Sequence, residues 1–424
     1  MHNLDSTYTA RRAAIGCLAV FATLGFVIAT WLSRLPAVRD ALELSPARIG
    51  TLLLIGSFGS LIALALTGPL IGRYGPRQIV RAGVSVWACG MSLVASAVAI
   101  HSENLISVGL VILSCGISMW GAAMNVEGGY IEKALKRSFL PKLHALFSFG
   151  TVCGAAAGAG LVHLGIPVVM HLVANVCIGL VTVWGMSSFW ILMTDISPHE
   201  SQITTAQETD KTPLKTPALT AAHSRAQVSQ GKVRYAWKEK TTVCISIMVL
   251  CAGLMEGAAN DWLALSMIDG YEFSEGKASL TLAFFLLTMM TVRLSSEKLH
   301  IRFGVAPLLR VLLLLACGGL LLVAAAPHWG LAMIGVTLWA IGAALIYPSA
   351  ASALSQDPYM TAARLSVLST INYGAFLIGP PVLGWIAEHI GYAQAMAFLV
   401  PSVLIGMLFT RWLPDGARIT GKNV

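Results

Sequence analysis

Three polar side chains close an otherwise apolar stretch that is long enough to cross a membrane: Glu256, Asn260 and Asp261. The stretch begins at Thr241 with TTVCISIMVLCAGLM and ends with EGAANDW. An ionisable side chain in a bilayer core costs at least about 2.5 kcal/mol, so such a residue either lies at the water interface or has a function. In a low dielectric a carboxyl group favours its neutral form, which is the chemistry of a proton carrier.

The helix that carries these residues sets how deep each of them lies. The predicted span 241–263 has its midpoint near Ala252. At about 1.5 Å per residue, Glu256 lies roughly 6 Å and Asp261 roughly 13 Å outward of that point. We therefore expect Glu256 inside the membrane and Asp261 near the outer interface. Asn260 follows Glu256 by four residues and shares its face. Glu256 is the first proton-coupling candidate; the alternative is an acid that ties its helix to a neighbour.

The composition is that of a multi-pass membrane protein. The 424 residues are 56% hydrophobic and 11% charged, whereas soluble domains carry about 25% charged residues. A bilayer core takes about 20 apolar residues per helix. The sequence therefore predicts an all-α membrane protein with twelve spans, at 13–33, 48–70, 79–99, 105–127, 143–163, 167–192, 241–263, 278–294, 305–325, 330–350, 366–387 and 393–412. The eight cysteines fall in apolar stretches without metal-ligand spacing, and we interpret them as packing residues.

The distribution of basic residues sets the orientation. With the N-terminus in the cytoplasm, all of the 28 Lys and Arg residues except Arg34, Arg39, Arg48 and Lys277 fall on the cytoplasmic side. The positive-inside rule then predicts that both termini are cytoplasmic. The same rule explains the net charge of +8 without nucleic acid as a partner.

A hydrophilic segment rich in Ser, Thr, Gln and Ala divides the spans six and six. It predicts a flexible cytoplasmic linker at 194–240 between a bundle at 1–193 and a bundle at 241–424. The two bundles resemble each other in sequence. TWLSRLP from Thr30 parallels DWLALSM from Asp261, and GRYG from Gly72 parallels IRFG from Ile301. A parallel duplication of six-helix units is typical of a secondary transporter with its site between the halves.

The loop after the second span carries a further motif. GPLIGRYGPRQ contains Gly68, Arg73, Gly75 and Arg77, and it resembles the Gly-x-x-x-Asp-Arg-x-Gly-Arg-Lys signature of the major facilitator superfamily. Gly72 replaces the acidic residue of that signature. AAMNVEGGYIEK, LHALFSFG and EGAANDW make the chain most similar to the bacterial fucose-permease-like branch and its uncharacterised inner-membrane relatives. The resemblance implies two six-helix bundles that expose a central cavity to each side in turn.

Two pairs of residues are gate candidates. Arg34 and Asp261 lie at the outer ends of the first and seventh spans, and we expect them to pair across the outer mouth; a solvent-exposed pair of little energetic value is the alternative. Glu127 and His144 lie near the cytoplasmic ends of the fourth and fifth spans. They form either a titrating inner pair, because histidine switches near neutral pH, or a contact that stabilises a helix junction. Glu127, His144 and Asp261 are therefore further proton-coupling candidates.

The remaining cavity candidates are polar or aromatic residues within spans. Asn125, Asn372 and Tyr373 suit the hydroxyl or amide groups of a polar solute, and ordinary interhelical hydrogen bonding is the alternative. Trp31, which the repeat relates to Trp262, is also a candidate. The glycine-rich run GAAAGAG in the fifth span predicts close helix contact and no chemistry.

The sequence predicts a secondary transporter, and the resemblance implies a small polar, sugar-like solute as its cargo and a bacterial inner membrane as its location. It contains no phosphate-binding loop, nucleophile elbow or zinc-binding helix, so we expect no enzyme activity and no cofactor or metal. The expected partners are the lipid bilayer, a small-molecule substrate and protons, and we expect a monomer. Proton symport is favoured because no aromatic-rich multidrug pocket is evident. A proton-coupled efflux antiporter and a non-transporting sensor or scaffold remain alternatives.

Overall fold

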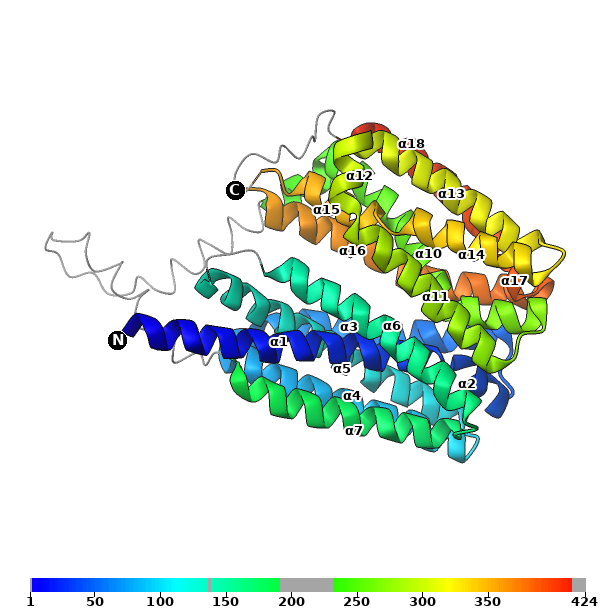
Figure 1. Ribbon diagram of the computed structural model, residues 1–424, viewed down its shortest axis with the longest axis horizontal. Coiled ribbons are helices and arrows are strands. Elements are labelled where there is room, and N and C mark those ends of the chain that lie inside the picture. The colour runs from blue at the N-terminus through cyan, green and yellow to red at the C-terminus, as the bar shows by residue number, and fades with distance from the viewer. Residues whose placement is uncertain (1, 136–138, 191–231, 358, 414–424) are drawn as a thin grey trace, which may run out of the picture.

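The protein folds into two helical halves that lie side by side. The computed structural model describes residues 2–135, 139–190, 232–357 and 359–413. Figure 1 shows that the two halves lie against each other at the end far from both termini and diverge toward the termini. We call the end at which they meet the closed end. Most of the predicted linker 194–240 lies outside the described residues.

Among the described residues, twelve helices are long and apolar enough to cross a membrane, and six of them lie in the first half. Its elements are α1 (His2–Leu32), α2 (Leu35–Ala41), α3 (Pro46–Tyr74), α4 (Pro76–Ala99), α5 (Glu103–Leu135), α6 (Leu140–His163), α7 (Val168–Met186) and the short η1 (Ser187–Phe189). α2 continues α1 after a break of two residues, so both belong to one span, Ala10–Ala41.

The second half repeats this arrangement with more breaks. Its elements are α10 (Lys240–Tyr271), α11 (Glu275–Leu294), α12 (Ser296–Phe303), α13 (Val305–Ala325), α14 (Trp329–Ala343), α15 (Ile346–Leu354), α16 (Thr361–Ile390), α17 (Tyr392–Ala395), η2 (Met396–Leu399), α18 (Val400–Phe409) and η3 (Thr410–Trp412). The twelve candidate membrane spans in the described part of the chain confirm the predicted number.

Several helices are longer than their predicted spans. α10 runs to Tyr271, eight residues past the predicted end at 263. Its midpoint is therefore close to Glu256, and Asp261 lies only about 8 Å beyond it at 1.5 Å per residue. Asp261 does not lie at the end of its helix, contrary to our expectation. The hydropathy criterion stopped at this polar cluster, whereas the helix continues because its outer turns pack against protein.

The internal repeat is visible in the backbone and in its anchoring contacts. Gly75 and Gly304 occupy corresponding turns with φ of 79° and 75°, a left-handed conformation that glycine adopts at little cost. Arg81 donates from Nε to Ser187 Oγ at 2.9 Å, and its counterpart Arg310 donates from Nε to Thr410 Oγ1 at 2.9 Å. In each half this arginine ties the third spanning helix to the end of the sixth.

Glycines of α6 allow the close contact with α1 that the sequence predicts. A Cβ at Gly150 would collide with the carbonyl oxygen of Ala22, and one at Gly154 with that of Phe26. The described end of the predicted linker differs from the expected irregular chain: residues 232–238 are helical. The physical reason is packing, since Ala236 is fully buried against Ala363 and Val367 of α16.

Candidate functional site: a charged cavity between the halves

A cavity of about 710 Å³ lies between the two halves, within the size range of small-molecule sites. The first half contributes neutral polar groups to its wall: Ser57, Ser60, Ser114, Ser118, Asn125, Ser148 and Thr151. The second half contributes Glu256, Asn260, Asp261, Arg293 and Tyr373. Every charged residue that lines this cavity in the described part of the chain therefore comes from the second half.

Most of the predicted cavity residues reach this space. The residues that line it are Trp31, Asn125, Glu256, Asn260, Asp261 and Tyr373. Asn372 does not line it: its Oδ1 lies against Gly253 of α10, where a Cβ would collide with it. Neighbouring residues on a helix point about 100° apart, and on α16 it is Tyr373 that faces the cavity.

The predicted inner pair lies outside the cavity lining. Glu127 is fully buried within the first half. The His144 ring stands edge-on against Phe21, with ring centroids 5.5 Å apart. A proton-coupling role for Glu127 and His144 stays a prediction.

Glu256 forms an ion pair with Arg293. From the sequence we assigned Arg293 only to the basic residues of the cytoplasmic side. Arg293 of α11 places its Nη2 at 3.1 Å from Oε2 and 3.3 Å from Oε1 of Glu256. Its Nε donates to the carbonyl oxygen of Ala344 at 3.0 Å, in the break between α14 and α15. The sequence could have indicated this ion pair, because Arg293 lies inside the predicted span 278–294 and an arginine within a membrane span needs a partner.

Asp261 differs from Glu256 in having no counter-charge. The structure gives its carboxylate no hydrogen bond or ion pair among the described residues. Its side chain is partly exposed and lines the cavity. On its other side Asp261 borders Leu254, Ala258 and Phe376. A carboxylate with apolar neighbours favours a proton or a bound cation.

The halves are joined at the closed end by ion pairs between unlike charges. Arg34, which is 3% exposed, places its Nη1 3.3 Å from Oε1 of Glu275 and donates from Nη2 to the Ile166 carbonyl at 3.0 Å. Its partner is therefore Glu275 of α11 rather than the predicted Asp261. Arg34 lies beyond the last turn of α1 and meets the start of α11, whereas Asp261 lies deeper, inside α10.

Two further contacts across the halves follow the same charge pattern. Arg39 donates from Nη1 to Oδ2 of Asp269 at 2.7 Å. The carboxylate of Glu388 accepts from the Ala47 backbone N–H at 3.0 Å, at the N-terminus of α3, where a negative charge is stabilised. In these contacts the first half supplies the donors and the second half the acids.

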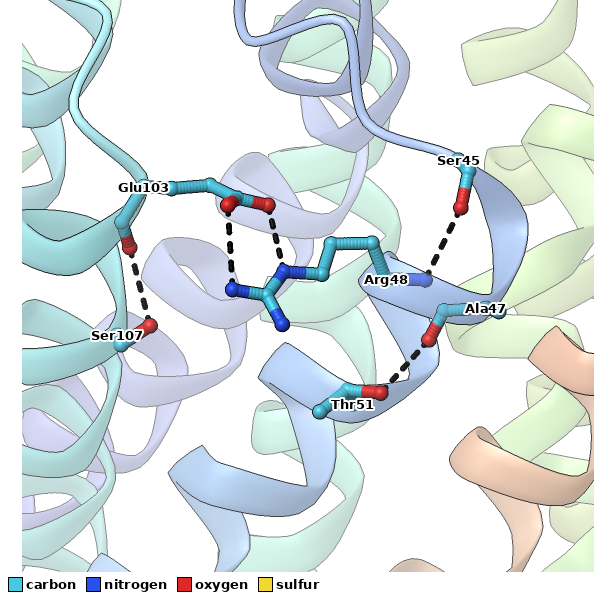
Figure 2. A network of polar contacts seen from close by, with 6 residues as sticks. All are labelled: Ser45, Ala47, Arg48, Thr51, Glu103 and Ser107. Carbon is cyan, nitrogen blue, oxygen red and sulfur yellow. Dashed lines mark hydrogen bonds and ion pairs between the residues drawn. The ribbon is translucent and has the colours of Figure 1, made fainter.

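The start of α3 is also fixed within its own half. Figure 2 shows Arg48 forming two hydrogen bonds with Glu103 of α5, with N···O distances of 2.6 and 3.1 Å, and Ser45 accepting from the Arg48 backbone N–H. This pair stabilises the first half without bridging to the second.

A proline in α16 creates one more link between the halves. Pro380 has no N–H, so the Phe376 carbonyl loses its helical donor. Ser57 of α3 lies with its Oγ 3.2 Å from that carbonyl and 2.9 Å from the Leu53 carbonyl of its own helix. Ser57 and Phe376 both line the cavity.

The predicted loop motif spans the end of α3, the turn at Gly75 and the start of α4, at the end near the termini. Gly75 makes the turn, and the Arg73 guanidinium lies 5.2 Å from the ring centroid of Tyr74. Gly68 has open space around it, and Arg77 Nε is buried without a hydrogen-bond partner among the described residues. The role of this motif stays a prediction.

Comparison with known proteins gives this architecture a family. The model of the Major Facilitator Superfamily matches residues 15–360. The chain belongs to this superfamily. It is 26% identical over 382 residues to the uncharacterized transporter y4wD of Sinorhizobium fredii, covering 88% of this chain and 90% of that protein. This major facilitator chain is a transporter rather than an enzyme.

Solved structures show the same fold. The nucleoside transporter NupG superposes with a TM-score of 0.71 at 13% identity, covering 96% of this chain and 99% of that one. FucP in the outward conformation gives a TM-score of 0.59 at 16% identity, covering 95% and 98%. The resemblance to the fucose-permease-like branch is confirmed at the level of fold.

Proposed function

We propose that this major facilitator protein moves a small polar solute across a bacterial inner membrane by alternating access, and that its cavity carboxyl groups couple the movement to protons. The observation that carries the proposal is the cavity between the halves, with polar groups from both halves on its wall. A sensor or scaffold has no need of such a space between two bundles.

The conformation supports alternating access. The ion pairs between the halves lie at the closed end, and the halves diverge toward the termini in Figure 1. With both termini cytoplasmic, as the basic residues predict, this is an inward-facing state. Transport then requires these ion pairs to break while the opposite end closes.

Asp261 is a better proton carrier than Glu256, our first candidate. Protonation of Glu256 would break its pair with Arg293, whereas protonation of Asp261 breaks no ion pair in the described structure. A neutral cargo does not neutralise the Asp261 carboxylate, so a proton must bind Asp261 as well. Cargo and proton then cross together, which is symport. A cationic cargo would replace that proton and give exchange.

The test is flux in proteoliposomes. Purified protein is reconstituted, and the uptake of labelled sugars, polyols, nucleosides and amines is measured with and without an imposed proton gradient. We expect gradient-dependent flux of at least one class, and Asp261→Asn should abolish the dependence. A solute that stabilises the protein against heat but never crosses the membrane would instead support the sensor alternative.

A further inference from the structure

The charge balance of the cavity narrows the class of cargo. Two carboxylates, Glu256 and Asp261, and one guanidinium, Arg293, line the cavity in the described part of the chain. With both acids ionised, the cavity carries one uncompensated negative charge. When the cavity is closed off from bulk water during alternating access, such a charge is unfavourable until a proton or a cation neutralises it.

Arg293 is not free to neutralise Asp261. Its Nη2 contacts both carboxylate oxygens of Glu256, and its Nε is bound to the Ala344 carbonyl. This second bond fixes the guanidinium toward the break between α14 and α15. The pair is therefore an internal, neutral unit, and the net charge of the cavity resides on Asp261.

The wall opposite these charges suits hydroxyl groups. Ser57, Ser60, Ser114 and Ser118 of α3 and α5 line the first-half side without any ionisable group. Serine hydroxyls can donate and accept hydrogen bonds. A solute that fills the cavity would meet a carboxylate on one side and hydroxyls on the other.

We infer that the cargo is a hydroxylated solute with a cationic amino group, and that its ammonium binds the carboxylate of Asp261. This inference rests on the proposed transport function and deepens it. Cargo and proton then compete for one carboxylate, so the protein exchanges an amine for a proton. A proton or an ammonium group on Asp261 neutralises the cavity equally well. The halves can then move without an uncompensated charge between them.

Few other titratable groups face this site. Besides Asp261, the lining holds Glu256 of α10, Arg293 of α11 and Tyr373 of α16. His144 of α6 lies outside this lining, with its ring edge-on against Phe21. α1, α3 and α5 contribute no titratable group to the lining. The pH dependence of amine binding should therefore report mainly on Asp261 and, through its pair, on Glu256.

The test uses probes that differ in charge. Purified full-length protein is titrated with N-methyl-D-glucamine and with D-glucitol, its neutral analogue on the same carbon chain, together with choline and its neutral analogue 3,3-dimethylbutan-1-ol. Binding is followed by calorimetry and thermal shift. We expect at least one amine to bind about tenfold tighter than its neutral analogue, and its affinity to fall as the pH is lowered.

Variants assign the effect to the carboxylate. Asp261→Asn should remove the preference for the amine, and Asp261→Glu, which keeps the charge, should retain part of it. Glu297→Gln of α12 removes one acid outside the cavity and should change neither affinity. Melting of each variant without ligand shows whether it is folded.

The outcomes separate this inference from the proposed function. It is overturned if no amine of the panel binds tighter than its neutral analogue, if acidification strengthens amine binding, or if folded Asp261→Asn keeps the preference. Proton-driven flux of a neutral polyol would leave the proposed function standing while refuting the amine. Absence of flux for every solute, with amine binding intact, would refute transport alone.

Discussion

Arg293 holds two elements of the second half together at the cavity wall. It binds a carboxylate of α10 and a main-chain carbonyl freed by the break after α14. A guanidinium suits this double role because its planar donors point in fixed directions. The pair with Glu256 is about one-third exposed, so solvent screening limits its contribution to stability.

Removing the guanidinium should destabilise the protein through both contacts. We expect Arg293→Ala to lower the free energy of unfolding by about 1–2 kcal/mol, because Glu256 and the Ala344 carbonyl lose a charged donor. The double variant Arg293→Ala with Glu256→Gln should recover part of the loss, since no unpaired charge remains. Thermal melts of the two single variants and the double variant measure the coupling; strictly additive effects would contradict it.

A second ion pair involves Glu239, which lies just before the span Lys240–Tyr271, and should be sensitive to acid. The Glu239 carboxylate accepts from Arg364 and Thr242 at 2.6–2.8 Å. Burial raises the pKa of Glu239, but the hydrogen bonds from Arg364 and Thr242 and the charge of Arg364 outweigh it and lower the pKa below its ordinary value of 4.5.

The sign of the pH effect follows from this lowered pKa. The unfolded chain binds a proton at Glu239 more readily than the folded protein, so the stabilisation is present above pH 4.5 and is lost as the pH falls through the folded pKa. We expect Glu239→Gln to melt below wild type at pH 7 and to approach it in acid. Melting temperatures across a pH series test this, and a constant difference would refute it.

At the scale of elements, glycine positions in α6 set how closely it approaches α1. Gly154 has no room for a Cβ, whereas Gly160 of the same helix has nothing within 4 Å. We expect Gly154→Leu to destabilise the protein by about 1–3 kcal/mol through overpacking, and Gly160→Leu to have little effect. The comparison of their melting temperatures is the measurement. Equal melting of the two variants would show that α6 and α1 are not in tight contact.

The helices and their number were predictable because membrane spans are long, apolar and local in sequence. Helix ends were less predictable: α10 continues to Tyr271 because protein, rather than lipid, surrounds its polar turns. Among the site residues, those on the cavity face follow from helical periodicity. Pairings such as Arg293 with Glu256 and Arg34 with Glu275 depend on how helices distant in sequence cross, and no local pattern contains that information.

At the scale of the whole molecule, the ion pairs of the closed end bias the two halves toward one conformation. We expect Arg39→Asp to part the halves there, because it places like charges against Asp269 and Asp40. Restoring opposite charges with Asp269→Arg should reverse much of the change. Pulsed EPR distances between spin labels at Leu164 and Trp329, in a background without the native cysteines, provide the measurement.

The matched control for this experiment is Arg48→Asp. Arg48 pairs with Glu103 inside the first half (Figure 2), so its reversal should leave the distance between the halves unchanged. If Arg39→Asp also leaves the distance unchanged, the Arg39–Asp269 pair does not hold the closed state.

The carbonyl that Pro380 leaves without a helical donor carries one more consequence. In this conformation its cross-half contact is the Ser57 hydroxyl, which departs with the first half when the closed end separates. Phe376 lines the cavity and is 37% exposed, so water or cargo in the cavity can take the place of this donor as the halves part. Separation of the halves should therefore exchange a protein contact for a hydrated one at this carbonyl.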